Sequence, residues 1–211
     1  MANVKRNASS LETQRRLLEA AGRVFAEKGF HSATIKEITE LAGTNLASVN
    51  YHFRDKAELY ASVLRRIEED AASAVPADEI LVGDPEQRLR AFVRHFVTTL
   101  LGRGQPVWER LLMARVFAEP TAARDSMFEN VGRPLYDKLR GIVGALCDRP
   151  PTSREVTLAA VSVIAQCIYH LQHQDGLAEY LAIRPVPMPE ELAEQIASFS
   201  LAPIIALRAA R

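Results

Sequence analysis

The sequence predicts an all-α protein that has a small three-helix module at its N-terminus and a larger helical body after it. Apolar residues recur at helical rather than alternating spacing in nearly every segment, and good helix formers dominate the composition. With 211 residues and 48% hydrophobic content, the chain is long enough for one large domain or two modest ones with a packed core.

The first two helices have recognisable ends. Ser9 and Glu12 have capping-box spacing, so the first helix is expected to begin near Ser9 or Ser10, and it should stop at Gly29, since a glycine there can adopt the left-handed conformation that closes a helix. Thr34 and Glu37 form a second capping box. The helix that they start must be short, because Gly43 follows about two turns later.

The next two helices follow without a long loop. A brief third helix is expected from about Asn45 to His52, with Val49 and Phe53 directed inward. Asp55 should cap a fourth helix, with Glu58 at its third position. The expected buried stripe of this fourth helix consists of Leu59, Val63 and Ile67.

A loop from Ala74 to Pro85 is the predicted module boundary, because Pro76, Gly83 and Pro85 interrupt the helical pattern there. Residues 1–56 are then the N-terminal domain, residues 56–74 a connecting helix, and residues 75–211 the body. Helices are expected in the body over Glu86–Leu101, Val107–Phe117, Pro134–Leu146, a segment capped by Thr152 and Glu155 that reaches about His173, and a last segment that opens at Pro189 and is kinked by Pro203.

Charge is distributed unevenly along the chain. Lys plus Arg equals Asp plus Glu at 26 each, yet residues 1–56 hold nine basic and six acidic side chains. This asymmetry suggests a basic N-terminal module. Cys147 and Cys167 have no paired spacing and are expected to be free buried thiols, with a redox-sensing pair as the less favoured alternative. Without an apolar leader or a membrane span, a cytoplasmic location is expected.

The segment from Thr34 to Lys56 reads TIKEITELAGTNLASVNYHFRDK and has the layout of a helix-turn-helix. Thr34 places a hydroxyl and free N–H groups at a helix start, which suits a phosphate. Gly43 permits a tight turn between two steeply crossed helices. Small side chains at Ala47 and Ser48 allow close approach to base edges, and donors for the sugar-phosphate backbone follow at Tyr51, His52 and Lys56.

At these residues the chain resembles the TetR family of bacterial repressors, whose reading head ends in Tyr-His-Phe with a Lys at the next helix start, here Tyr51, His52, Phe53 and Lys56. The resemblance covers about residues 13–63. It implies an N-terminal helix-turn-helix DNA-binding domain plus a larger helical ligand-binding and dimerisation domain. It also implies that bases are contacted by Asn45, Leu46 and Ala47, and that phosphates are contacted mainly by Thr34, Ser48, Tyr51, His52 and Lys56.

Two residues depart from the family pattern. Asn50 stands where many members have an aromatic residue, so a hydrogen bond to a base or phosphate is expected in its place. Thr44 stands where Val is common, and its similar shape makes the exchange tolerable. The alternative is that three short amphipathic helices form only a small core, which explains Val49 and Phe53 but not the polar residues around them.

The segment from Val156 to Leu171 is apolar almost all round, except for a polar stripe at Ser162, Gln166, His170 and His173. The favoured interpretation is a hydrogen-bonded strip at a dimer seam or at a partly exposed surface. The other is a polar edge of an effector pocket. A metal site that adds His95 is not expected, because recognised ligand spacing is absent.

An apolar pocket is the second possibility in the body. Its candidate lining residues are Phe92, Phe96, Trp108, Met113, Phe117, Phe128 and Tyr136, although residues at helical spacing are more often plain core. The effector-pocket hypothesis rests on Phe92, Phe96, Met113 and Phe117 together with Gln166 and His170. An apolar or aromatic small molecule is the expected effector, and no cofactor or metal is expected.

These patterns favour a ligand-responsive homodimeric repressor that binds a near-palindromic double-stranded DNA operator and dimerises through its C-terminal helices. The alternative is a ligand-binding or interaction module with a degenerate reading head. An enzyme is disfavoured, since no nucleophile–base motif, metal-binding doublet or phosphate-cradling glycine loop is present.

Overall fold

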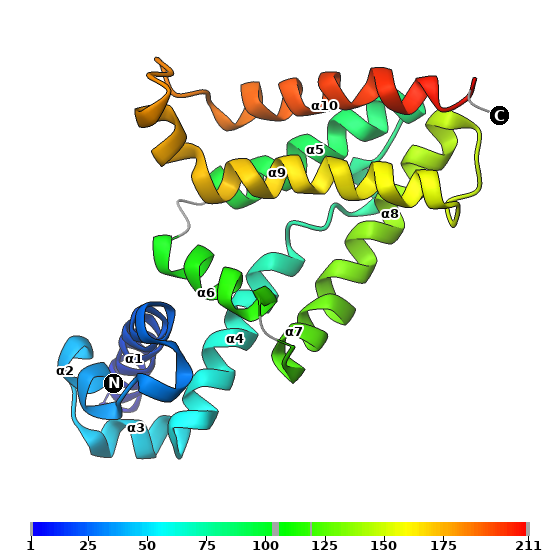
Figure 1. The fold of residues 1–211 in the computed structure, drawn as a ribbon. Helices are drawn as coiled ribbons and strands as arrows, with labels where there is room; N and C mark the ends of the chain where they lie inside the picture. Colours follow the sequence, from blue (N-terminus) through cyan, green and yellow to red (C-terminus); the bar gives the residue numbers. More distant parts are fainter. Residues whose placement is uncertain (1, 103–105, 119, 210–211) are drawn as a thin grey trace. The chain divides into compact units, whose positions relative to one another are not determined.

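The computed structural model describes residues 2–102, 106–118 and 120–209, and all regular secondary structure in these ranges is helical (Figure 1). The chain divides into two compact units. We call Met1–Asp70 with Pro106–Ser126 the head, and Ala71–Gln105 with Met127–Arg211 the body. None of the described helices has the length and apolar character that a membrane span requires.

Four helices open the head: α1 (Ala2–Ser32), α2 (Ile35–Ala42), α3 (Leu46–Phe53) and α4 (Lys56–Ala72). The expected start of the first helix near Ser9 is wrong, because α1 already begins at Ala2. Glu12 does not close a capping box at that start, and its carboxylate instead accepts two hydrogen bonds from Arg15. The expected stop at Gly29 is confirmed, since its φ of 76° breaks the helical path within α1.

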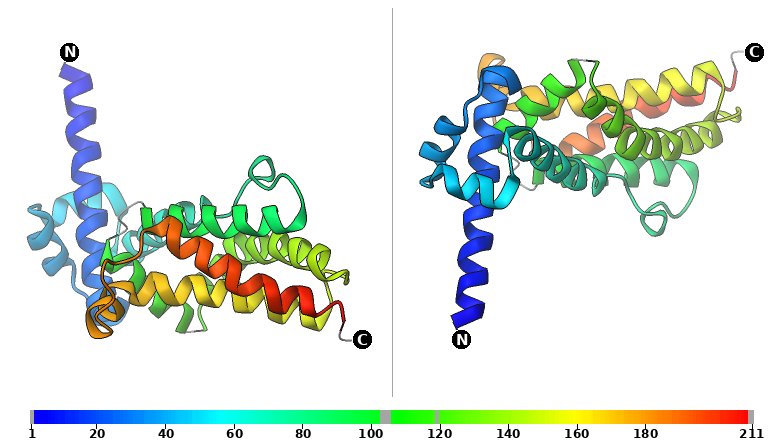
Figure 2. Two further views of the ribbon diagram at one scale, coloured as in Figure 1. Left: turned by 90° about the horizontal axis from the view of Figure 1, so that it is seen from above. Right: turned by 90° about the horizontal axis from the view of Figure 1, so that it is seen from below.

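The other expected features of these helices hold. Thr34 and Glu37 make the capping box of α2. Val49 and Phe53 of α3 are buried, as are the three apolar residues of the α4 stripe, Leu59, Val63 and Ile67. In both further views α2 and α3 lie beside α1 (Figure 2). The core of the head therefore forms where α1, α2, α3 and α4 present their apolar faces.

A fifth helix, α6 (Val107–Ala118), also belongs to the head, whereas the sequence suggested that it would lie in the body. Its Trp108 is buried and donates its indole N–H to Glu19 of α1 at 3.0 Å. Arg115 donates to the carbonyls of Ala26 at 2.8 Å and Glu27 at 3.0 Å, which lie in the last turn before the break in α1. These contacts attach α6 to α1. The residues that make them are far apart in the sequence, so helical periodicity does not reveal the contact.

The body consists of the short helical turn η1 (Asp78–Ile80), α5 (Pro85–Gly102), a π-helical turn η2 (Phe128–Gly132), α8 (Arg133–Cys147), α9 (Arg154–Tyr180) and α10 (Pro189–Ala206). A small helix, α7 (Ala122–Met127), spans the division between head and body and had no counterpart in the sequence prediction. Helices α5, α8, α9 and α10 pack on one another and enclose one apolar core.

Two predicted features of α9 are wrong. Its cap is Ser153 rather than Thr152, since the Ser153 hydroxyl accepts a hydrogen bond from the Val156 N–H at 3.3 Å. The helix also runs to Tyr180, beyond the expected end near His173. Pro189 does open α10 as expected, and Pro203 lies inside α10, which continues to Ala206.

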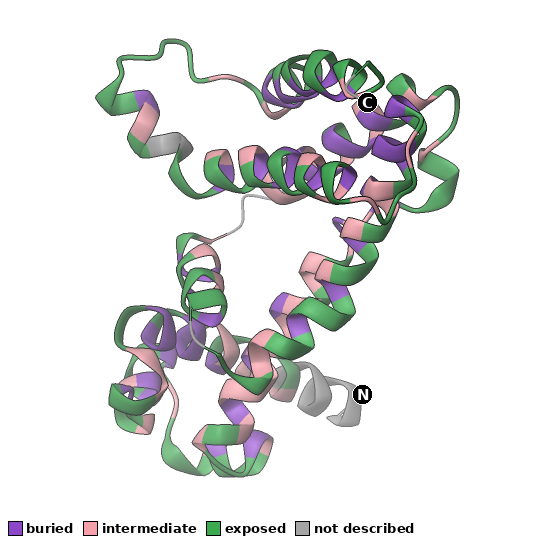
Figure 3. Ribbon diagram, turned by 45° about the vertical axis from the view of Figure 1, so that its right-hand side comes forward, coloured by how far each residue is buried: buried purple, intermediate pink, exposed green. Residues whose placement is uncertain are grey.

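Helices α9 and α10 carry exposed residues along their length (Figure 3), and several of these residues are apolar. On α9, Leu158, Val161, Ile168 and Tyr169 share one face because they recur at helical steps, and each is at least 37% exposed. On α10, Phe199 is 73% exposed and Ile205 is 40% exposed. Exposed apolar side chains that cluster on neighbouring helices can mark an interaction surface.

Candidate nucleic-acid interface

The start of α2 is held by a closed set of hydrogen bonds. The Thr34 hydroxyl accepts from the Glu37 N–H at 3.3 Å and donates to the Glu37 carboxylate at 2.9 Å. Lys28 reaches the same carboxylate at 2.6 Å. The hydrogen bonds from Lys28 and Thr34 lower the pKa of Glu37 to about 2. Thr34 remains exposed, but its hydroxyl proton is already used within the head.

The turn between α2 and α3 is set by Gly43, whose φ of 61° and ψ of 41° lie in the left-handed region. Asn45 follows as the cap of α3, and its side-chain oxygen accepts from the Ser48 N–H at 3.0 Å and the Ser48 hydroxyl at 3.2 Å. Asn45 is expected to contact a base and Ser48 a phosphate. In the structure the two residues are hydrogen-bonded to each other and together cap the start of α3.

Helix α3 presents its remaining face outward. Leu46 is 58% exposed and Tyr51 is 79% exposed, while Ala47 and Asn50 are also exposed. The half-buried His52 packs its ring edge-on against the Tyr51 ring at 4.9 Å between centroids. Since Val49 and Phe53 fix the opposite face in the core, the exposed residues form a continuous strip on a short, well-capped helix.

Lys56, predicted to contact a phosphate, is bonded within the head. Its ammonium group donates to the carbonyls of Ala33 at 2.7 Å and His31 at 3.2 Å, and it lies 4.7 Å from the centre of the Phe30 ring. Lys56 therefore ties the start of α4 to the segment between α1 and α2. An ammonium has three donors, so one remains for a phosphate beyond the two used here.

The corner between α3 and α4 is sharp. The Asp55 N–H donates to the Phe53 carbonyl at 2.6 Å, and Arg54 between them has a φ of 61° and a ψ of −54°. This is a γ-turn, which is a strained conformation for a residue with a side chain. Asp55 then caps α4 by accepting from the Glu58 N–H at 2.8 Å, and this backbone hydrogen bond lowers the pKa of Asp55. The geometry of this turn sets the direction in which α4 leaves α3.

The residues predicted for an effector pocket are divided between the body and the head. Phe92 and Phe96 are buried in the core of the body with their rings stacked 6.5 Å apart. Met113 and Phe117 belong to α6 in the head. In the body, Gln166 donates to the hydroxyl of the buried Ser200 at 3.2 Å, so this part of the polar stripe lies at the contact between α9 and α10.

The other stripe residues differ in exposure. His170 is half-buried, whereas Ser162 and His173 are exposed, and the His173 ring lies tilted against the Tyr169 ring with 4.8 Å between centroids. His95 bonds through a ring nitrogen to the Ser73 carbonyl at 3.0 Å. Within the described ranges, the His, Cys, Asp and Glu side chains form no group of three placed to hold a metal ion.

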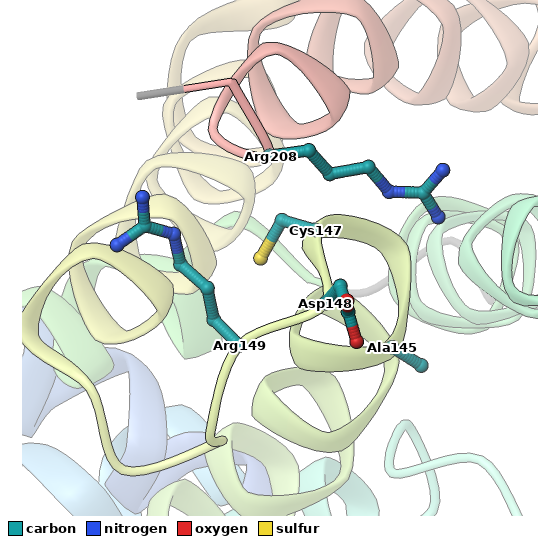
Figure 4. Close-up of a pocket in the computed structure, with 5 residues that line it drawn as sticks. All are labelled: Ala145, Cys147, Asp148, Arg149 and Arg208. Atoms are coloured by element: carbon teal, nitrogen blue, oxygen red, sulfur yellow. The ribbon is translucent and has the colours of Figure 1, made fainter. Parts of the chain in front are cut away.

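A cavity of about 500 Å³ lies where α8 and α10 end (Figure 4). Its lining residues are Ala145, Cys147, Asp148, Arg149 and Arg208. Arg149 is used as a helix cap, because it donates to the Leu207 carbonyl at 2.8 Å and 3.1 Å. Figure 4 shows the Arg149 and Arg208 side chains extending in different directions, so they do not converge on one anion. This polar cavity is unlike the apolar pocket predicted from the sequence.

The two cysteines are both buried in the body core. Burial raises the pKa of the Cys167 thiol to about 12. Because the thiolate is the reactive form, such a thiol is inert at neutral pH. This finding favours the expected structural role over a redox pair.

The capped helix α3, the glycine turn before it and the second, helical unit define a helix-turn-helix regulator with a head and a body. Comparison with known proteins agrees with this class. Residues 17–63 match the family described as "Bacterial regulatory proteins, tetR family", and residues 85–204 match "HTH-type transcriptional dual regulator CecR, C-terminal domain". The chain belongs to the TetR family of transcriptional regulators.

Curated relatives agree with this assignment. The chain is 36% identical over 177 residues to the transcriptional repressor NicS of Pseudomonas putida, covering 81% of each chain. It is 32% identical over 131 residues to the transcriptional activator FasR of Mycolicibacterium smegmatis, where the match spans 58% of this chain and only 60% of that protein. Relatives thus include both a repressor and an activator.

Solved structures show the same fold. AibR, crystallised with isovaleryl coenzyme A and operator DNA, superposes with a TM-score of 0.64 at 18% identity, over 89% of this chain and 97% of that one. A TetR-family regulator from Rhodococcus gives a TM-score of 0.65 at 16% identity, over 90% and 95% of the two chains. At these identities the similarity establishes the shared fold.

Proposed function

We propose that this chain is a homodimeric transcriptional repressor that binds a near-palindromic DNA operator through α3 and releases it when an effector binds the body. The observation that carries the proposal is the outward strip of α3, where Leu46, Ala47, Asn50 and Tyr51 are exposed on a helix capped by Asn45. An eight-residue helix presented in this way fits a major groove, which is about 12 Å wide.

DNA selection from a random pool, followed by binding measurements on the recovered duplex, tests the reading head. Two half-sites related by a two-fold axis and spaced about one helical turn apart, or a multiple of it, are expected. Tyr51→Ala should weaken binding to all duplexes, because Tyr51 is a proposed backbone contact. Tyr180→Ala is the matched control, since Tyr180 is 87% exposed but lies in the body. Recovery of no duplex would favour the alternative of a degenerate reading head.

The exposed apolar faces of α9 and α10 support dimerisation through the C-terminal helices. A stable protein interface buries about 800 Å² per partner and is rich in aromatic and apolar residues near its centre. Phe199→Asp should convert the dimer into a monomer in light scattering, because it places a charge at the most exposed aromatic residue of α10. Val82→Asp, at a loop residue that is 67% exposed, should leave the dimer intact.

An apolar or aromatic small molecule remains the proposed effector. Because AibR was crystallised with isovaleryl coenzyme A, acyl-coenzyme A thioesters belong in the panel to be screened by thermal shift. A true effector should both raise the melting temperature and weaken DNA binding, since it must favour one conformation over the other. His170→Ala should alter the effector response and leave operator affinity intact; loss of the dimer in this variant would instead place His170 at the seam.

A further inference from the structure

Between residues 10 and 56 the head contains seven Lys and Arg side chains, and six of them form an ion pair or a hydrogen bond within the head. Carboxylates hold Arg15, Arg23, Lys28, Lys36 and Arg54 in ion pairs of 2.6–3.9 Å. Lys56 is bonded to backbone carbonyls. In the described stretch from residue 10 to residue 56, Arg16 is the Lys or Arg side chain with neither an ion pair nor a hydrogen bond.

Arg16 is exposed, and its position is informative. One of its terminal nitrogens lies 3.7 Å from the point where a Cβ on Gly43 would be. The guanidinium of a residue on α1 therefore lies against the turn between α2 and α3. Asn45, the cap of α3, is two residues beyond Gly43, at most about 7.6 Å away between Cα atoms. Arg16 thus flanks the first turn of the reading helix.

Neighbouring acids leave this charge available. Glu12 lies one turn before Arg16 on α1, and the Arg15 side chain occupies it with hydrogen bonds of 2.8 Å and 3.0 Å. The Arg16 charge acts on Glu12 only at a distance, helping to lower the pKa of that carboxyl after the stronger effect of Arg15. A phosphate that meets Arg16 therefore displaces solvent and counterions rather than a protein carboxylate.

We propose that Arg16 is a DNA-phosphate contact that binds the backbone beside the first turn of α3, whereas Tyr51 lies near the other end of this helix and Lys56 lies at the start of α4. The proposal rests on the proposed function, since it assumes that α3 enters a major groove. Phosphates line both sides of a groove about 12 Å wide, so a helix lying in it meets a backbone within reach of a long side chain. Arginine suits such a contact because its planar fork binds phosphate through two N–H groups.

The test measures binding of the full chain to two labelled duplexes, the one recovered from the random pool and one of mixed sequence, over a range of KCl concentrations. Each phosphate neutralised contributes about 0.9 to the slope of log K against log[salt]. Arg16→Ala should therefore reduce the slope by about one per head and weaken binding about eightfold per head near 0.1 M salt, for both duplexes. Arg16→Lys should keep most of the slope because it keeps the charge.

Arg23→Ala is the matched control. Arg23 lies two turns after Arg16 on the same helix and carries the same charge, but Glu19 accepts two hydrogen bonds from it at 3.0 Å and 3.2 Å. Its loss should leave the salt slope unchanged. A wild-type slope in Arg16→Ala, while Tyr51→Ala still weakens binding, would overturn the Arg16 contact alone. Equal losses in Arg16→Ala and Arg23→Ala would also overturn it, since net charge would explain both. If the wild-type chain binds neither duplex, the proposed function and the Arg16 contact are both overturned.

Discussion

Gly22→Ala should loosen the attachment of α6 to α1, although alanine is the better helix former. One edge of the Trp108 ring lies against α1 at Gly22, so a Cβ there would lie within 2.6 Å of three ring carbons. Carbon atoms pack at about 3.5–4.0 Å, so the ring must retreat by about 1 Å. That movement strains the 3.0 Å hydrogen bond from the Trp108 indole to Glu19.

The expected size of the effect follows from three contributions. Overpacking costs about 1–3 kcal/mol, and weakening a hydrogen bond to a carboxylate adds about 1.5 kcal/mol. Replacing a helical glycine with alanine returns about 1 kcal/mol. Gly22→Ala should therefore lose about 1.5–3.5 kcal/mol of stability. Gly141→Ala is the control, because Gly141 is exposed on α8 with nothing within 4 Å of an added Cβ, and it should gain about 1 kcal/mol.

Urea unfolding followed by tryptophan fluorescence measures this directly, since Trp108 is the one tryptophan of the chain. In Gly22→Ala the native emission should shift to the red as the ring becomes more exposed. In a Trp108→Leu background, Gly22→Ala should cost far less, because the clashing ring is gone. A Gly22→Ala variant that is as stable as Gly141→Ala would refute the steric argument.

Three further substitutions test individual groups in the head. Thr44→Val should gain about 1 kcal/mol in urea unfolding, because the Thr44 hydroxyl is buried without a hydrogen-bond partner; a loss of stability would contradict this. Lys56→Met should lower the free energy of unfolding by about 2 kcal/mol, since two hydrogen bonds to carbonyls disappear. Unchanged stability together with weaker DNA binding would mean that Lys56 acts only as a DNA contact. Burial, and then the nearby Asp70 carboxylate, raise the pKa of Glu109, so ionising it destabilises the folded head as pH rises above about 4.5. Glu109→Gln should thus be more stable than wild type at pH 7 and no more stable below pH 4.5, and a gain that is equal at both pH values would exclude ionisation as its cause.

Features that depend on near neighbours in the chain could be predicted from the sequence. The capping box of Thr34 and Glu37, the left-handed turn at Gly43 and the cap of α4 by Asp55 each join residues a few positions apart, and all are present in the structure. The spacing of Val49 and Phe53 likewise sufficed to place them in the core. The family resemblance came from this same segment, where local chemistry and function coincide.

The partners of residues that are distant in the chain depend on how the helices pack, and the sequence pattern does not reveal them. The sequence marks Lys56 as a cation at a helix start, but its bond to the Ala33 carbonyl depends on how α4 packs against the end of α1. Trp108 and Gly22 are far apart in the chain, so their contact, and with it the place of α6 in the head, leaves no periodic signal. In the sequence Arg16 is one basic residue among many, and it stands out only because folding gives a partner to the other Lys and Arg side chains of residues 10–56. Local hydrogen bonds follow from sequence spacing, whereas the pairing of charges and the burial of rings depend on which helix faces meet.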